Sequence, residues 1–149
     1  MDRYVSEELE LPASEGQPPF TRADLIFHEV DHSGESFEAR IFLNAPDADE
    51  HTPTTSETGF AGYFYIFGHG GCAGEEGHCE VPENPDDTDD LRLAHPLRPA
   101  TKPVVVTEAL RALTEARFTV TVVPVMPGAE GPRRGDLLFF EELELVTYD

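Results

Sequence analysis

The chain has 149 residues, the length of one ordinary domain, and its 39% hydrophobic content with ten phenylalanines is enough for one packed core. Thirty acidic and ten basic residues give a formal charge of −20, which repels phosphate backbones and argues against nucleic acid and anionic membranes as partners. Because no apolar run approaches the roughly 18 residues of a membrane-spanning helix, the sequence predicts a soluble, acidic protein.

The first residues predict an extended arm. Residues 1–22 have a loose apolar pattern interrupted by turn-forming residues, so we expect an arm over 1–22 and a single β-sandwich domain over 23–149. The acidic start lacks a basic region followed by an apolar one, so no signal peptide is visible. The expected compartment is the cytoplasm, with export in complex with a secreted partner as the alternative.

Two strand-like segments follow, at 23–32 and 36–44, with a turn signal around Gly34 between them. In the second segment apolar residues alternate with Glu38 and Arg40, which is the pattern of a strand with one buried face. The two segments are predicted to form a β-hairpin. Polar, turn-rich residues 45–59 then predict a long surface loop.

Residues 60–67 are nearly all aromatic or apolar. The run is too short for a confident helix, so it predicts a central strand covered on both faces. The acidic, proline-rich residues 80–99 lack the ligand spacing of an EF-hand and predict a solvated loop.

The last third of the chain combines strands with one short helix. A strand is predicted at 103–106, and Thr107 is a candidate N-cap for a helix over 108–116 whose inner face carries Leu110 and Leu113.

Alternating residues from Phe118 to Val122 and the segment 137–148 predict further strands. Glutamates 141, 142 and 144 in the last strand have the character of edge protection, and ordinary solvent exposure explains them equally well. The fold class predicted from the whole pattern is an all-β, antiparallel sandwich of about six to eight strands with one short helix.

Both cysteines and two of the six histidines lie within residues 69–79, directly after the predicted 60–67 strand. His69, Cys72, His78 and Cys79 offer two imidazoles and two thiolates, a set suited to tetrahedral zinc or to Cu(I). Adjacent His78 and Cys79 can bind one ion together only if the backbone turns sharply, which the neighbouring glycines permit.

Two other states of the cysteines are compatible with the sequence. A Cys72–Cys79 disulfide would close a small glycine-rich ring, as is normal in oxidising compartments, or the thiols could remain reduced. Metal site, disulfide and free thiols therefore stay open.

Several separate segments resemble the C-terminal domain that follows the di-copper domain in polyphenol oxidases and many bacterial tyrosinase-like proteins. They are FEARIFLN at 37–44, FAGYF at 60–64, VVTEALRAL at 105–113 and FTVTVVP at 118–124. The loop at 68–82 resembles the bacterial version of that domain. The plant version has Lys-Phe-Asp-Val where this chain has Glu-Ala-Arg-Ile at 38–41, so the two charges exchange sign, which is compatible with a retained cross-strand pair.

The resemblance implies a domain that sits against a type-3 copper oxidase and shields, stabilises or helps to load metal into that enzyme. A type-3 copper centre needs histidines supplied by a helical bundle, whereas the six histidines here are scattered over a β pattern. The chain is therefore expected not to be an enzyme on its own, and no catalytic residue is predicted. The alternatives are a small copper- or zinc-binding protein that uses the 69–79 loop, or an interaction module with an unrelated protein partner.

Overall fold

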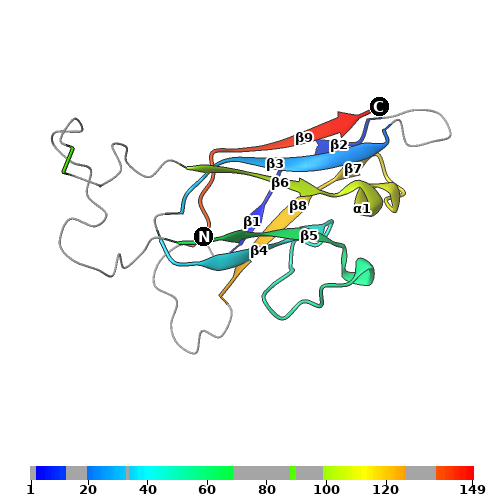
Figure 1. Cartoon of the computed structure of the whole chain (residues 1–149). Coiled ribbons are helices and arrows are strands. Elements are labelled where there is room, and N and C mark those ends of the chain that lie inside the picture. The colour runs from blue at the N-terminus through cyan, green and yellow to red at the C-terminus, as the bar shows by residue number, and fades with distance from the viewer. Residues whose placement is uncertain (1–2, 13–19, 33, 69–87, 90–98, 127–136) are drawn as a thin grey trace.

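The computed structural model describes residues 3–12, 20–32, 34–68, 88–89, 99–126 and 137–149. Within these ranges the chain forms nine strands, one α-helix and one 3-10 helix. Two sheets stack as the layers of a sandwich, with β9, β3 and β6 in the upper layer of Figure 1 and β1, β8, β4 and β5 in the lower layer. The predicted all-β sandwich is confirmed.

All strand pairings are antiparallel. The four-stranded sheet has the order β1-β8-β4-β5, formed by Tyr4–Val5, Val120–Val125, Phe37–Leu43 and Phe60–Ile66. The three-stranded sheet has the order β6-β3-β9, formed by Ala100–Val105, Arg22–Val30 and Glu142–Tyr148. A small third sheet joins β2, Leu9–Glu10, to β7, Arg117–Phe118.

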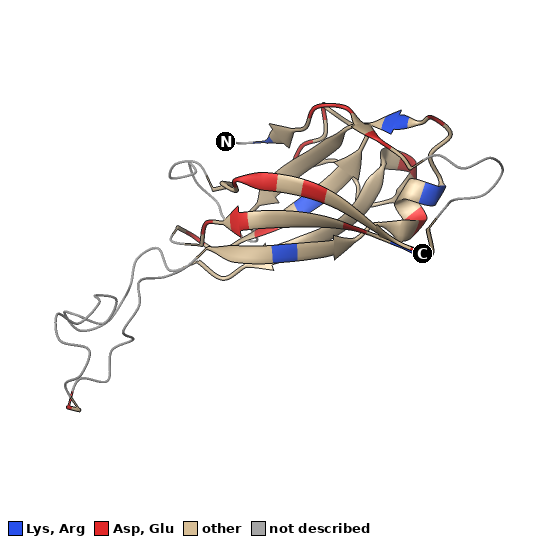
Figure 2. Cartoon of the chain, turned by 90° about the horizontal axis from the view of Figure 1, so that it is seen from above, with Lys and Arg blue, Asp and Glu red and all other residues tan. Residues whose placement is uncertain are grey.

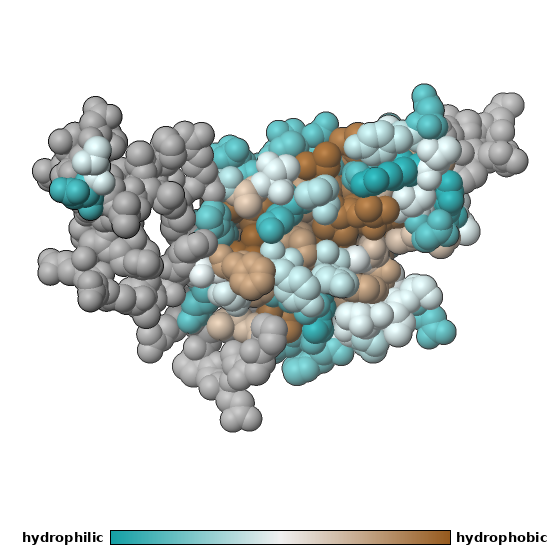
Figure 3. Space-filling model, in the orientation of Figure 1, coloured by the Kyte–Doolittle hydropathy of each residue, from teal (hydrophilic) through white to brown (hydrophobic). Residues whose placement is uncertain are grey.

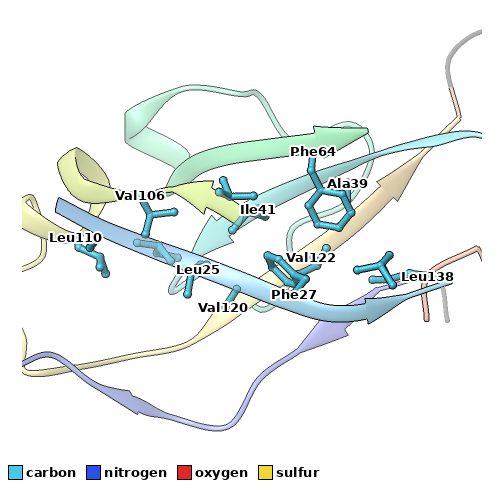
Figure 4. Packing of buried hydrophobic residues seen from close by; sticks show 14 of the residues in the cluster. Leu25, Phe27, Ala39, Ile41, Phe64, Val106, Leu110, Val120, Val122 and Leu138 are labelled. Atoms are coloured by element: carbon cyan, nitrogen blue, oxygen red, sulfur yellow. The ribbon is translucent and has the colours of Figure 1, made fainter. Parts of the chain in front are cut away.

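The core lies between the two larger sheets and is built from alternate residues of each strand. Leu25 and Phe27 on β3 and Ala39 and Ile41 on β4 are completely buried there, as the close-up in Figure 4 shows. The rings of Phe27 and Phe64 lie 5.0 Å apart across the core. Period-two alternation in the sequence is therefore what places one apolar face of each strand inside the sandwich.

The predicted hairpin is wrong. β3 lies in the three-stranded sheet and β4 in the four-stranded sheet, so the residues between them cross from one layer to the other. Both strands carry an apolar face, and the two faces pack against each other through the core instead of lying side by side in one sheet. A turn signal between two amphipathic strands does not distinguish these two arrangements, because each buries the same side chains.

The prediction of a central strand at 60–67 is also wrong. In the described part of the chain β5 lies at the edge of its sheet with β4 as its strand neighbour. Phe64 and Ile66 point into the core, whereas Tyr63 and Tyr65 are half exposed. The tyrosine rings make the whole segment hydrophobic on average while their hydroxyl groups tolerate water.

One side of the sandwich closes where β5 meets β6. Gly62 has a φ of +154°, and a Cβ there would lie 2.7 Å from Cγ1 of Val104, so the position suits glycine alone. A register shift in the pairing of β4 with β5 falls at the same point. In Figure 3 hydrophobic residues, coloured brown, gather where the two sheets meet on this side.

Residues 3–12, which belong to the predicted arm, run along the sandwich and supply β1 and β2. Tyr4, Leu9 and Leu11 pack against the core as partly buried side chains. Burial and the nearby charge of Glu7 raise the pKa of Tyr4.

The helix α1, Thr107–Arg111, is shorter than the predicted 108–116, and Thr107 is its first residue and not its N-cap. The Thr107 hydroxyl instead accepts a hydrogen bond from the backbone N–H of Ala23 at 3.0 Å, which ties the helix to β3. Leu110 is buried and Leu113 partly buried, as predicted. None of the helices in the described ranges is long and apolar enough to cross a membrane.

Candidate interaction surface

His69, Cys72, His78 and Cys79, the predicted metal or disulfide residues, lie outside the described residues. The metal, disulfide and free-thiol alternatives therefore stay predictions. Elsewhere, within the described ranges, no group of three or more histidine, cysteine, aspartate or glutamate side chains is placed to hold a metal ion.

The outer face of the four-stranded sheet brings aromatic and charged side chains together. Because Phe37, Ala39, Ile41 and Leu43 of β4 point inward, the residues between them point outward. Cross-strand register then places Tyr65 beside Glu38 and Tyr63 beside Arg40. Two tyrosines and two opposite charges thus share one end of this outer face.

The other end of the outer face is covered by the loop at 44–59. Asn44 ends β4 with a φ of +53°, a left-handed conformation that asparagine tolerates, and its side chain accepts a hydrogen bond from the backbone N–H of Thr119 at 3.0 Å. The loop then places Ala48 against Phe42 and Val123 in a second small buried cluster.

Several contacts fix this loop in place. Arg3 Nη1 donates to the carbonyl of Ala48 at 3.1 Å, and Arg40 Nη1 donates to the carbonyl of Glu50 at 3.4 Å. The rings of Phe42 and Phe60 meet edge to face at 5.6 Å beneath it. The predicted surface loop is therefore mostly exposed, and it covers one end of the outer face of the four-stranded sheet.

We call the end that carries the exposed tyrosines the tyrosine face and define it by Glu38, Arg40, Tyr63 and Tyr65. Tyr63 is 52% exposed and Tyr65 is 50% exposed, and their rings hold an edge-to-face arrangement with centroids 5.3 Å apart. Phe67, two residues beyond Tyr65, is 82% exposed. Two alternate positions of β5 and the position just after its end thus present three aromatic side chains to solvent.

Glu38 and Arg40 form an ion pair in the tyrosine face, with Arg40 Nε 2.9 Å from Glu38 Oε1. The expected cross-strand pair is therefore a pair within one strand, between residues two positions apart. Both side chains are mostly buried, at 16% and 23% exposed. The negative charge of Glu38 is the main cause that raises the pKa of Tyr65, with desolvation second.

The outer face of the three-stranded sheet also pairs its charges, and one of its cations lies near an aromatic ring. Arg22 donates to Asp24 through Nε at 2.8 Å and Nη2 at 3.0 Å, and its guanidinium lies 5.7 Å from the ring centroid of Tyr148. His28 Nε2 lies 2.8 Å from Glu144 Oε2 on the neighbouring strand. Figure 2 shows acidic residues in red along this layer.

Comparisons with known proteins support the fold. No protein-family model matches the chain, and no curated protein matches it. Among solved structures, latent aurone synthase (polyphenol oxidase) from a natural source matches with 17% identity over 98% of this chain and a TM-score of 0.53. The recombinant latent enzyme gives 19% identity over 99% of this chain with a TM-score of 0.53, and its co-crystal with hexatungstotellurate(VI) gives 18%, 98% and 0.54.

The chain spans 24% of the length of these oxidase chains, and the matched portion is their C-terminal part. At these identities the likeness is one of fold. The chain thus has the fold of the C-terminal domain of a tyrosinase-like protein, and the resemblance seen in the sequence is confirmed at that level.

The exposure of the tyrosines was missed from the sequence, although one signal for it was present. In residues 60–66 the two tyrosines occupy alternate positions, Tyr63 and Tyr65, while Phe64 and Ile66 fill the positions between and after them. Tyrosines that alternate with purely apolar residues are typical of a strand with one buried face and one face exposed to solvent.

Proposed function

We propose that this chain is a non-catalytic accessory domain of a tyrosinase-like, type-3 copper oxidase and acts by binding that enzyme as a protein partner. The observation that carries the proposal is the match of nearly this whole chain to the C-terminal 24% of polyphenol oxidase chains. A domain of that kind would shield the copper site, stabilise the enzyme or assist its metal loading.

The surfaces of the sandwich support a binding role. One outer face pairs its own charges, whereas the other exposes Tyr63 and Tyr65 beside a mostly buried ion pair. Exposed aromatic side chains on an ordered sheet are the residues that contribute most to protein interfaces.

Co-expression with a tyrosinase-like oxidase encoded beside this chain tests the proposal. We expect a complex on size-exclusion chromatography and a change in the copper content or activity of the oxidase, relative to the oxidase expressed alone. An unrelated acidic β-sandwich protein is the control for crowding and charge. If no complex forms and copper content and activity both stay unchanged, the proposal is wrong.

The cluster of His69, Cys72, His78 and Cys79 favours a second function, the binding of one zinc or copper ion. Elemental analysis of untagged protein should then find near one equivalent of metal, which Cys72→Ser removes. A Cys72–Cys79 disulfide instead predicts an intact mass that rises by about two hydrogens on reduction. That mass change together with an absence of metal would contradict the metal function.

A further inference from the structure

Exposed aromatic side chains concentrate at the β5 edge. Tyr63, Tyr65 and Phe67 form a row on alternate residues, whereas the other large exposed apolar side chains of the described structure come from separate segments. Those others are Val5, Val105, Phe139 and Tyr148. Single exposed hydrophobic residues are ordinary, but a contiguous row marks an interaction site.

The backbone beside this row can accept another strand. In the described part of the chain β5 pairs with β4 on one side and has no strand neighbour on the other. Near Gly62 the strand lies against Val104 of β6, so the edge considered for an added strand is the rest of β5, from Tyr63 to Ile66. An extended segment that added to this edge would run about 4.8 Å from β5 and place every second side chain beside Tyr63 and Tyr65.

Charge decides which kind of segment fits. Glu38 lies opposite Tyr65, and its negative charge outweighs that of Arg40 at the tyrosine hydroxyl. Arg40 is engaged by Glu38 and by the carbonyl of Glu50. Among the described residues the cation placed over a tyrosine ring is Arg22, which lies on the other sheet over Tyr148. The rings of the tyrosine face therefore carry no cation of the described chain.

The whole chain carries a formal charge of −20, so a second copy is repelled and a cationic segment is attracted. Arginine suits the site better than lysine, because its planar guanidinium stacks on aromatic rings and also bonds to carboxylates.

We propose that the β5 edge and the tyrosine face bind an extended, arginine-bearing segment of a protein partner, with guanidinium groups over Tyr63 and Tyr65. The inference deepens the proposed function, on which it rests for the partner being a protein. Strand addition supplies affinity through the backbone, and the tyrosine rings beside Glu38 select the cation.

A peptide of eight residues that alternates arginine with threonine, blocked at both ends, is the probe. The matched control peptide carries citrulline, which has the shape of arginine without its charge. Titration of the full chain, followed by backbone amide NMR, should give shifts confined to β5 and its neighbours with the arginine peptide. Added salt should weaken binding, and the citrulline peptide should bind about tenfold more weakly.

Two variants test the rings directly. Tyr63→Ala with Tyr65→Ala should weaken binding of the arginine peptide about tenfold, whereas Phe139→Ala, at a position 60% exposed, should change it less than about twofold. Tyr63→Leu with Tyr65→Leu keeps apolar bulk at both positions. That variant should discriminate between the arginine and citrulline peptides less than the native chain does, because Glu38 and the net charge remain while the aromatic rings are lost.

Equal binding of the two peptides to the native chain would overturn the proposal. So would shifts centred on the three-stranded sheet, or a dimer in sedimentation that the leucine variant dissolves, because the tyrosine face would then be a self-contact. Peptide binding without an oxidase complex would refute the proposed function alone. An oxidase complex without peptide binding would refute this surface alone.

Discussion

The two outer faces of the sandwich differ in the kinds of side chain that they present to solvent. The three-stranded sheet turns charged side chains outward and pairs them, as in Arg22 with Asp24 and His28 with Glu144. The four-stranded sheet buries Phe42 under the 44–59 loop at one end and leaves tyrosines open at the other. An apolar outer face needs a cover, and this chain supplies the cover for only one half of it in the part that the structure describes.

The largest expected effect comes from the covered half. Phe42→Ala should lower the free energy of unfolding by about 3–5 kcal/mol, because the ring is fully buried although it lies on an outer face. Guanidinium unfolding followed by far-ultraviolet circular dichroism measures this change. Tyr63→Ala is the matched control in the open half, with an expected loss below about 1 kcal/mol. Equal losses would show that the two halves are covered to the same degree.

Gly59 tests how the covering loop re-enters the sheet. This residue has a φ of +84°, and an added Cβ would collide with the backbone carbonyl oxygen of Leu43. Gly59→Ala should therefore cost about 2 kcal/mol of stability in the same unfolding experiment. Gly34→Ala is the control, since no atom lies within 4 Å of the Cβ that it would add. A similar cost at both glycines would contradict the strain at Gly59.

A smaller effect, of opposite sign, is expected at Thr121. Its side chain points to the outer face and is fully buried, and its hydroxyl has no hydrogen-bond partner among the residues that the structure places. Thr121→Val should stabilise the protein by about 1 kcal/mol. On folding, a buried hydroxyl without a partner loses its hydrogen bonds to water, whereas the methyl group that replaces it made none. Thr119→Val, at a partly exposed neighbour, should bring no such gain. A loss of stability in Thr121→Val would show that the hydroxyl is bonded in solution.

The smallest effect concerns the charge of the open half. The raised pKa of Tyr65 stabilises the fold below its unfolded value of 10.0, and that contribution is lost as pH rises through the folded pKa. Glu38→Gln should lower the pKa of Tyr65 toward 10.0. The difference in tyrosinate absorbance between each protein and its Tyr65→Phe derivative isolates this group. Glu142→Gln on β9 should leave the titration unchanged, and an equal shift there would refute the local origin.

The sequence predicted where the strands lie better than it predicted which strands pair with each other. Alternation in 37–43 predicted a strand with one buried face, and Phe37, Ala39 and Ile41 are indeed buried. The hairpin of β3 with β4 was wrong because two amphipathic strands bury the same faces whether they pair in one sheet or pack across two. The helix was placed correctly near Leu110, but Thr107 bonds to Ala23 in β3, a contact between residues far apart in sequence.

The binding surface could be predicted only in part. Tyr63 and Tyr65 stand at alternate positions in the sequence, which indicates a strand face exposed to solvent. The prediction of a strand covered on both faces instead followed the high apolar content of residues 60–67 as a whole. The candidate ligands from His69 to Cys79 were found by residue type alone, and they remain a sequence prediction.

By itself the sequence determined that this chain forms an all-β sandwich, because the period of its apolar residues specifies strands with one buried face. It also determined the acidic charge, and it carried the resemblance to an oxidase C-terminal domain. Only the tertiary structure decided that β5 is an edge strand and that the 44–59 loop covers one half of the outer face. The physical reason is that burial of an outer face depends on which distant segments cover it, whereas burial of an inner face follows from local alternation.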